Sequence, residues 1–140
     1  AGHQIGNHSY SHNMLVFMSP ENIRNEINST NNSIRNAGYT GEIMFRPPYG
    51  KKLVYLPYYL KQSGIKTIMW DIEPDSYGNV TGSTENIISK VTETVSPGSI
   101  IILHAMGDNV ATRNAIEPTI KKLKADGYKF VTAEQLLRSN

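Results

Sequence analysis

Short apolar segments alternate with amphipathic helical segments along the chain, and this alternation restricts the possible folds more than any other feature of the sequence. A repeated strand–helix order is typical of α/β proteins in which helices cover a parallel sheet. The apolar segments predict strands at residues 43–45, 66–70, 99–103 and 128–131, with a fifth near Ile5. A chain of 140 residues accommodates one core, so we expect residues 1–140 to form a single domain.

Residues that start and stop helices bound the segments between these strands. Ser19 and Pro20 mark the start of the first helix, and Gly38 follows its last turn. Thr132 and Gln135 form a capping box at the start of the last helix. The remaining predicted helices cover residues 55–63, begin at Ser83 or Thr84, and follow Thr112 up to Gly127.

Composition and charge exclude several classes of function. No apolar run approaches the roughly 18 residues that a membrane-spanning helix needs, so we expect no membrane span. The 14 basic and 12 acidic residues are spread along the chain, which does not favour nucleic-acid binding. Because the chain has no cysteine, thiolate metal sites, disulfides and cysteine nucleophiles are ruled out.

Chemically unusual residues stand at the ends of three predicted strands. Arg46 follows one strand directly, and His104 follows another. Trp70 and Asp71 end a third. In parallel α/β proteins the active site lies at the carboxyl ends of the strands, where loops converge. This placement is the first indication of a functional site.

Two histidines, His8 and His12, stand four residues apart. On a helical turn, residues at this spacing share a face, so both imidazoles could reach one divalent cation. The alternative is a pair of surface histidines without a ligand. A catalytic zinc normally has three protein ligands, so the pair alone is not a complete site.

His104 and the turn at residues 46–50 each allow two interpretations. His104 is either a general acid or base tuned by a carboxylate, or a core histidine bonded to backbone groups. In the sequence Arg-Pro-Pro-Tyr-Gly the prolines fix the backbone, so the turn could hold Arg46 and the amide of Tyr49 in fixed directions. The alternative is an ordinary loop.

An acidic segment and a group of tyrosines complete the candidates. Asp71, Glu73 and Asp75 form either a solvated loop or an oxygen-ligand site for a cation. The tyrosines either pack in the protein or stack on sugars; they are Tyr55, Tyr58, Tyr59 and Tyr77.

Four motifs occur in a fixed order along the chain. They read Gly-His-Gln-Ile-Gly-Asn-His-Ser-Tyr-Ser-His, Arg-Pro-Pro-Tyr-Gly, Trp-Asp-Ile-Glu-Pro-Asp and Ile-Ile-Leu-His. In this order they resemble the motifs of the NodB-type polysaccharide deacetylases, carbohydrate esterase family 4. Such enzymes remove acetyl groups from chitin, peptidoglycan or acetylxylan with a divalent metal. The resemblance implies an α/β fold of the distorted (β/α) barrel type, a polysaccharide substrate, and a secreted or cell-envelope location.

The resemblance also implies a role for each matching residue. His8 and His12 match the paired ligands of the divalent metal, which we expect to be zinc. His104 matches the catalytic acid. Arg46 matches the arginine that orients the catalytic base, and Tyr49 matches the residue whose backbone amide stabilises the oxyanion.

Substrate contacts and the carboxylate partner of His104 follow from the same comparison. The expected substrate-binding residues are Pro48, Trp70 and Ile102, the last at a position where the family usually has a leucine that lines the acetyl-methyl pocket. The family often reads Asp-x-x-Asp-Trp where this chain reads Glu-Pro-Asp-Ser-Tyr. The carboxylate that tunes His104 is therefore Asp75, one place early, or is supplied differently.

The opening motif of the family, Thr-Phe-Asp-Asp, has no match in the 140 residues. In the family this motif supplies the base and a third metal ligand. We therefore interpret the chain as the carboxyl-terminal part of a deacetylase domain, whose barrel lacks its first strands. A partial barrel leaves sheet edges unpaired. We expect pairing with the missing amino-terminal segment of the same protein or self-association, and little or no activity of the isolated chain.

The implied function is metal-dependent hydrolysis of acetyl groups on a polysaccharide, and two alternatives stay open. One is a deacetylase-like domain that binds glycans and is catalytically silent. The other is an anion site lined by arginine and tyrosine on an ordinary α/β domain that binds no metal. An intact Asp-Asp pair upstream would favour the enzyme over the silent domain.

Overall fold

The computed structural model describes residues 2–76 and 82–139. These residues form two compact units. The first contains the residues up to Met69 together with those from Thr132 onward, and the second contains the described residues between Trp70 and Val131. None of the described helices is long and apolar enough to span a membrane.

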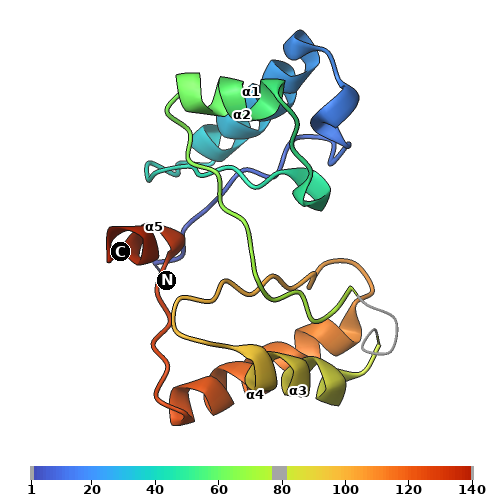
Figure 1. Ribbon diagram of the computed structural model, residues 1–140, viewed down its shortest axis with the longest axis vertical. Helices are drawn as coiled ribbons and strands as arrows, with labels where there is room; N and C mark the ends of the chain where they lie inside the picture. The colour runs from blue at the N-terminus through green and yellow to red at the C-terminus, as the bar shows by residue number, and fades with distance from the viewer. Residues whose placement is uncertain (1, 77–81, 140) are drawn as a thin grey trace. The chain divides into compact units, whose positions relative to one another are not determined.

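The described residues of the first unit form three α-helices and two short 3₁₀ turns, and Figure 1 labels the α-helices. These elements are η1 (Leu15–Phe17), α1 (Pro20–Asn36), η2 (Pro48–Gly50), α2 (Tyr55–Gln62) and α5 (Ala133–Arg138). The hydroxyl of Ser19 accepts a hydrogen bond from the Asn22 amide, which caps α1 as predicted. Thr132 and Gln135 form the predicted capping box of α5. Both starts follow from local hydrogen bonding, which sequence patterns capture well.

The second unit contains α3 (Thr84–Thr94) and α4 (Val110–Ala125), which lie side by side (Figure 1). Ser83 caps α3, which begins at Thr84, one of the two predicted starts. The prediction that the next helix follows Thr112 is wrong, because α4 begins at Val110 and contains Thr112 in its first turn. The Thr112 hydroxyl is not used as a cap, because it is buried and donates to Asp75.

The predicted strands do not form as regular strands in the described residues. Extended segments are joined instead by three isolated parallel bridges: Asn7 with Phe45, Phe45 with Thr67, and Ile72 with Ile101. Residues 128–131 make no bridge. The parallel direction agrees with the predicted α/β arrangement, but the described residues contain no barrel sheet.

The pairing beside Phe45 ends for an identifiable reason. The Arg46 carbonyl accepts a hydrogen bond from Nδ1 of His8, so a side chain takes the place of a backbone partner. The next two residues are prolines, which have no N–H to donate. On the neighbouring segment Ser9 has a φ of 65°, which turns the chain out of the extended conformation. The pairing therefore stops where the predicted site begins.

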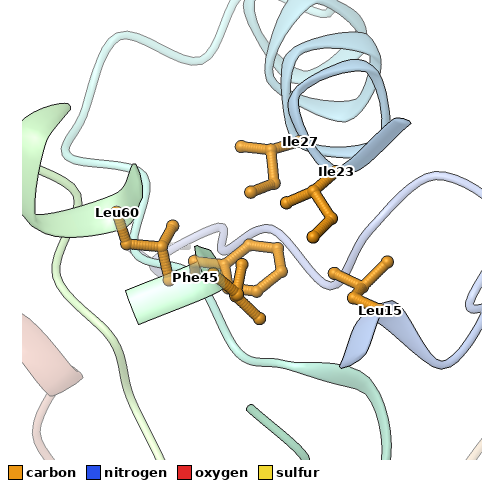
Figure 2. Packing of buried hydrophobic residues seen from close by; sticks show 6 residues of the cluster. Leu15, Ile23, Ile27, Phe45 and Leu60 are labelled. Carbon is orange, nitrogen blue, oxygen red and sulfur yellow. The ribbon is translucent and has the colours of Figure 1, made fainter. Parts of the chain in front are cut away.

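Each unit has its own cluster of buried apolar side chains. In the first unit Phe45 is fully buried, and Figure 2 shows the labelled side chains gathered around it. This cluster consists of Leu15, Ile23, Ile27, Phe45, Leu56 and Leu60. The cluster of the second unit consists of Ile72, Val91 and Leu123. Burial of one such side chain contributes about 1.5–3 kcal/mol, so these clusters stabilise the units to which they belong.

Candidate functional site

The rings of His8 and His12 lie together in the first unit, on a loop that is not helical. Their centroids are 4.8 Å apart, and the ring planes meet at 71°. Ser9 and His12 have φ values of 65° and 57°, so an irregular turn brings the rings together. The helical turn that we expected from the spacing is therefore wrong, although the two imidazoles are neighbours.

Asn7 holds this loop against α1. Its side chain is almost completely buried. The Nδ2 group donates to the Ile27 carbonyl at 2.8 Å and to Oδ1 of Asn31 at 2.7 Å. Oδ1 of Asn7 accepts from the Ser9 amide at 2.9 Å. Asn7 therefore fixes the backbone on both sides of His8.

Glu26 of α1 is the second anchor. Its Oε2 accepts hydrogen bonds from the amides of Tyr10 and Ser11 at 3.0 and 2.8 Å, and its Oε1 accepts from the Ser11 hydroxyl at 2.7 Å. Burial disfavours the charged carboxylate, but the hydrogen bonds from Ser11 and Tyr10 outweigh it and lower the pKa of Glu26. Sequence reasoning missed both anchors, because tertiary hydrogen bonds leave no periodic pattern in a sequence.

The contact between His8 and Arg46 fixes the proton on the imidazole. Nδ1 of His8 lies 2.6 Å from the Arg46 carbonyl oxygen. A carbonyl only accepts, so Nδ1 carries the proton, and the lone pair of the neutral ring is on Nε2. A metal-binding histidine typically has this arrangement. In the described segments no group of three or more histidines and carboxylates is placed to hold a metal ion. The two neighbouring imidazoles would supply two nitrogen ligands, which is fewer than the protein ligands a zinc site normally has.

The turn that follows Phe45 presents Arg46 and Tyr49 differently. The backbone amide of Arg46 donates to the Asn7 carbonyl. Nη2 of the Arg46 side chain donates to the Met69 carbonyl at 3.3 Å. Burial lowers the pKa of the Arg46 guanidinium. Pro48 is buried, whereas Tyr49 is exposed and has a φ of 59°. The Tyr49 ring lies 5.0 Å from the His12 ring, in an edge contact.

The Tyr49 amide differs from the two amides that follow it in its hydrogen bonding. Gly50 donates its N–H to the Pro47 carbonyl, and Lys51 donates to the Pro48 carbonyl. Among the residues that the structure describes, none accepts a hydrogen bond from the Tyr49 N–H. This donor remains available to an incoming group.

The carboxylate of Asp75 contacts His104 in the second unit. Oδ1 of Asp75 lies 2.9 Å from Nδ1 of His104, and Oδ2 accepts from the His104 amide at 2.6 Å. The Asp75 side chain is 2% exposed and the His104 side chain 39%. Oδ2 also accepts from the Thr112 hydroxyl at 3.1 Å. The sequence left open whether Asp75 or another group supplies the carboxylate partner of His104. In the structure Asp75 contacts His104.

The other residues of the acidic segment have different partners. Asp71 accepts from the Ile100 amide at 2.6 Å and from the Ser99 hydroxyl at 2.7 Å. Glu73 accepts from Nε1 of Trp70 at 2.8 Å. Each carboxylate of the segment therefore has its own donors, which gives no support to a shared cation site. Ile102 is buried and bonds through its amide to the Ile72 carbonyl.

The tyrosines of α2 pack mainly within the first unit. Tyr55 stacks on Tyr59, with ring centroids 6.3 Å apart, and both pack against the apolar cluster around Phe45. The Tyr55 hydroxyl accepts from Arg24. This favours packing over sugar stacking for these two, whereas Tyr58 is exposed. Tyr77 lies outside the described residues.

The structure thus gathers two groups of predicted residues, each within its own unit. In the first unit contacts link Arg46 to His8, His8 to His12, and His12 to Tyr49. In the second unit Asp75 contacts His104.

Comparison with known proteins points to one family. The family model described as polysaccharide deacetylase matches residues 1–68. The peptidoglycan-N-acetylglucosamine deacetylase of Bacillus cereus is 30% identical over 138 residues, which cover 98% of this chain and 64% of that protein. The solved structure of peptidoglycan deacetylase PdaC from Bacillus subtilis is similar with a TM-score of 0.83 and 30% identity, over 98% of this chain and 64% of that one.

A further similar structure is a CE4 family pseudoenzyme from Bacillus anthracis. Its TM-score is 0.83 at 28% identity, over 96% of this chain and 46% of that one. The chain spans less than two thirds of the length of each of these relatives.

Proposed function

Because this chain belongs to the polysaccharide deacetylase family, we propose that it carries the proton donor and two metal ligands of a hydrolase that removes acetyl groups from a polysaccharide. The substrate class that we propose is N-acetylglucosamine-containing or otherwise acetylated polysaccharide at the cell envelope or outside the cell. The observation that carries the proposal is the buried carboxylate of Asp75 on Nδ1 of His104.

His104 acts in this proposal as the general acid. Because Asp75 binds Nδ1, the opposite nitrogen, Nε2, is the one that exchanges a proton with the substrate. When the bond between the acetyl carbon and the sugar nitrogen or oxygen breaks, Nε2 gives its proton to the departing amine or hydroxyl. The carboxylate stabilises the imidazolium before that transfer, as in other acid–base pairs of this geometry.

His8 and His12 are the proposed ligands of a divalent metal, zinc by family expectation. When bound, such an ion polarises the acetyl carbonyl and lowers the pKa of a bound water. His8 presents Nε2 because its Nδ1 is held by the Arg46 carbonyl. The third ligand and the base are assigned to the family motif that these 140 residues lack. We propose that they come from an amino-terminal segment or a second copy; a well-folded monomer of this chain in light scattering would contradict this part.

Arg46, Tyr49 and three apolar side chains have supporting roles in the proposal. The guanidinium of Arg46, held by the Met69 carbonyl, orients the base. The Tyr49 amide donates to the oxyanion, where one donor is worth about 3 kcal/mol. Substrate contacts are assigned to Pro48, Trp70 and Ile102, of which Pro48 and Ile102 are buried before any substrate binds.

A catalytically silent glycan-binding domain is the second candidate. It is favoured by the similarity to the Bacillus anthracis structure, which is described as a pseudoenzyme. In that case the residues around His104 would bind sugar without transferring a proton.

Acetate release from an N-acetylated chitooligosaccharide with zinc present tests the proposal. A chimera is made in which this chain replaces the matching 64% of the Bacillus cereus deacetylase, so that the relative supplies the remainder. We expect the chimera to release acetate, the chain alone to release little or none, and His104→Ala in the chimera to lower the rate at least about 100-fold. His3→Ala, at an exposed position, is the control. A folded chimera that binds the oligosaccharide without releasing acetate would favour the silent domain.

A further inference from the structure

We propose that Thr112 is a positioning residue, which holds the carboxylate of Asp75 so that one oxygen stays on Nδ1 of His104. The inference rests on the proposed role of His104 as proton donor. Thr112 belongs to α4, is 3% exposed, and donates its hydroxyl to Oδ2 of Asp75 at 3.1 Å. It was not among the residues predicted to form the site.

The two oxygens of Asp75 have different partners, and this division determines its orientation. Oδ2 accepts two hydrogen bonds, from the His104 amide and from the Thr112 hydroxyl. Oδ1 is thereby directed at Nδ1 of His104. Without Thr112, both oxygens would be held by His104 alone, through its amide and its Nδ1. Thr112 adds a donor from α4 that holds the carboxylate independently of His104, and with the Asp75 side chain only 2% exposed water is a poor substitute for this donor.

The start of α4 also holds the backbone of His104, the partner of Asp75. Nδ2 of Asn109, at the N-cap position, donates to the His104 carbonyl at 2.7 Å. The backbone of His104 and the carboxylate of Asp75 are therefore both tied to the first turn of one helix. Arg113, in the next position of that turn, bonds to the carbonyls of Ala105 and Gly107 and holds the loop that follows His104.

A second buried threonine on α4 provides a matched control. Thr119 is 4% exposed, and its hydroxyl has no partner in the part of the chain that the structure describes. It lies seven residues after Thr112, which is two helical turns along the same face. Replacing either threonine by valine removes one buried hydroxyl and keeps the shape of the side chain. Only the change at Thr112 removes a hydrogen bond to Asp75.

The experiment measures which ring nitrogen of neutral His104 carries the proton, from ¹⁵N chemical shifts of the full 140-residue chain. In the wild type we expect the Nδ1–H form. In Thr112→Val we expect the ratio of the Nδ1–H to the Nε2–H form to fall about fivefold or more, because α4 no longer holds the carboxylate in the orientation that keeps Oδ1 on Nδ1. Thr112→Ser should restore the ratio, and Thr119→Val should leave it at the wild-type value.

Each result decides the inference. An unchanged ratio in Thr112→Val, or an equal fall in Thr119→Val, would overturn it. If Thr112→Val does not fold, the wild-type spectrum still tests the geometry, since an Nε2–H ring would overturn the inference. If the ratio changes as expected while the chimera releases no acetate, the Thr112 assignment stands and the proposed hydrolase function fails.

Discussion

Oδ1 of Asp75 lies 2.9 Å from Nδ1 of His104, and the same carboxylate accepts the backbone amide of His104 through its other oxygen. One side chain thus fixes both the ring and the backbone of the histidine. Because a carboxylate only accepts, Nδ1 must donate, which leaves Nε2 as the nitrogen that would exchange a proton in the proposed function.

Asp75→Asn should reverse the tautomer of His104. The amide oxygen of asparagine must take the Oδ2 position, where it accepts from the His104 amide and the Thr112 hydroxyl. Its NH₂ group then faces Nδ1, which can only accept, so the ring proton moves to Nε2. We expect the ¹⁵N spectrum to report the Nε2–H form and the chimera to lose acetate release at least about 100-fold. Retention of the Nδ1–H form would contradict the assigned hydrogen bonds.

Glu26→Ala should weaken zinc binding, although Glu26 is not a proposed metal ligand. The substitution removes the hydrogen bonds that hold Tyr10 and Ser11, so the His8–His12 loop is released from α1. We expect a loss of about tenfold in zinc affinity by calorimetry. Glu26→Gln should recover most of it, because the amide oxygen can accept both backbone amides while NH₂ donates to the Ser11 hydroxyl. Glu21→Ala, at an exposed position of α1, is the control; an equal loss there would point to general damage to the helix.

The lowered pKa of Glu26 predicts a contribution to stability that depends on pH. Since the folded pKa lies below the ordinary value of 4.5, folding favours the charged form. The contribution is therefore fully present above pH 4.5 and is lost as the pH falls through the folded pKa. Measured by urea unfolding, the free energy of unfolding of the wild type should exceed that of Glu26→Gln above pH 4.5. This difference should shrink in more acidic solution. A difference that grows on acidification has the wrong sign for this account.

Tyr49→Gly should be more stable than Tyr49→Ala. The backbone φ of 59° at this position costs an L-residue about 1 kcal/mol, and glycine adopts it without that cost. Both variants lose the ring contact with His12. The order should be reversed at Asn25, an exposed position inside α1, where glycine is about 1 kcal/mol worse than alanine. The same order at both positions, measured by chemical denaturation, would argue against the left-handed turn.

Local features of this chain were predictable from its sequence, and tertiary ones were not. The caps at Ser19 and Thr132 depend on residues within three positions, so their patterns predict the helix starts correctly. The strand beside Phe45 was expected from its apolar residues, but its pairing is cut short by the hydrogen bond from His8 to the Arg46 carbonyl. That bond joins residues 38 positions apart and has no counterpart in hydrophobic periodicity.

The candidate site shows the same division. The motifs identified His8, His12 and His104, and the spacing of the first two predicted that they form a pair. The turn between them, with positive φ at Ser9, and the anchors Asn7 and Glu26 became visible only in three dimensions. The sequence places Thr112 before a helix, whereas in the structure it is buried within α4 and its hydroxyl donates to Asp75.

X-ray absorption spectroscopy of the zinc-loaded chain tests the paired-imidazole site most directly. We expect one zinc with two imidazole nitrogens at about 2.0–2.1 Å, and one fewer in either His8→Ala or His12→Ala, with weaker binding. His104→Ala and His3→Ala should leave both the spectrum and the affinity unchanged. Zinc that keeps two imidazole ligands in His8→Ala, or that is lost equally in His104→Ala, would contradict the account.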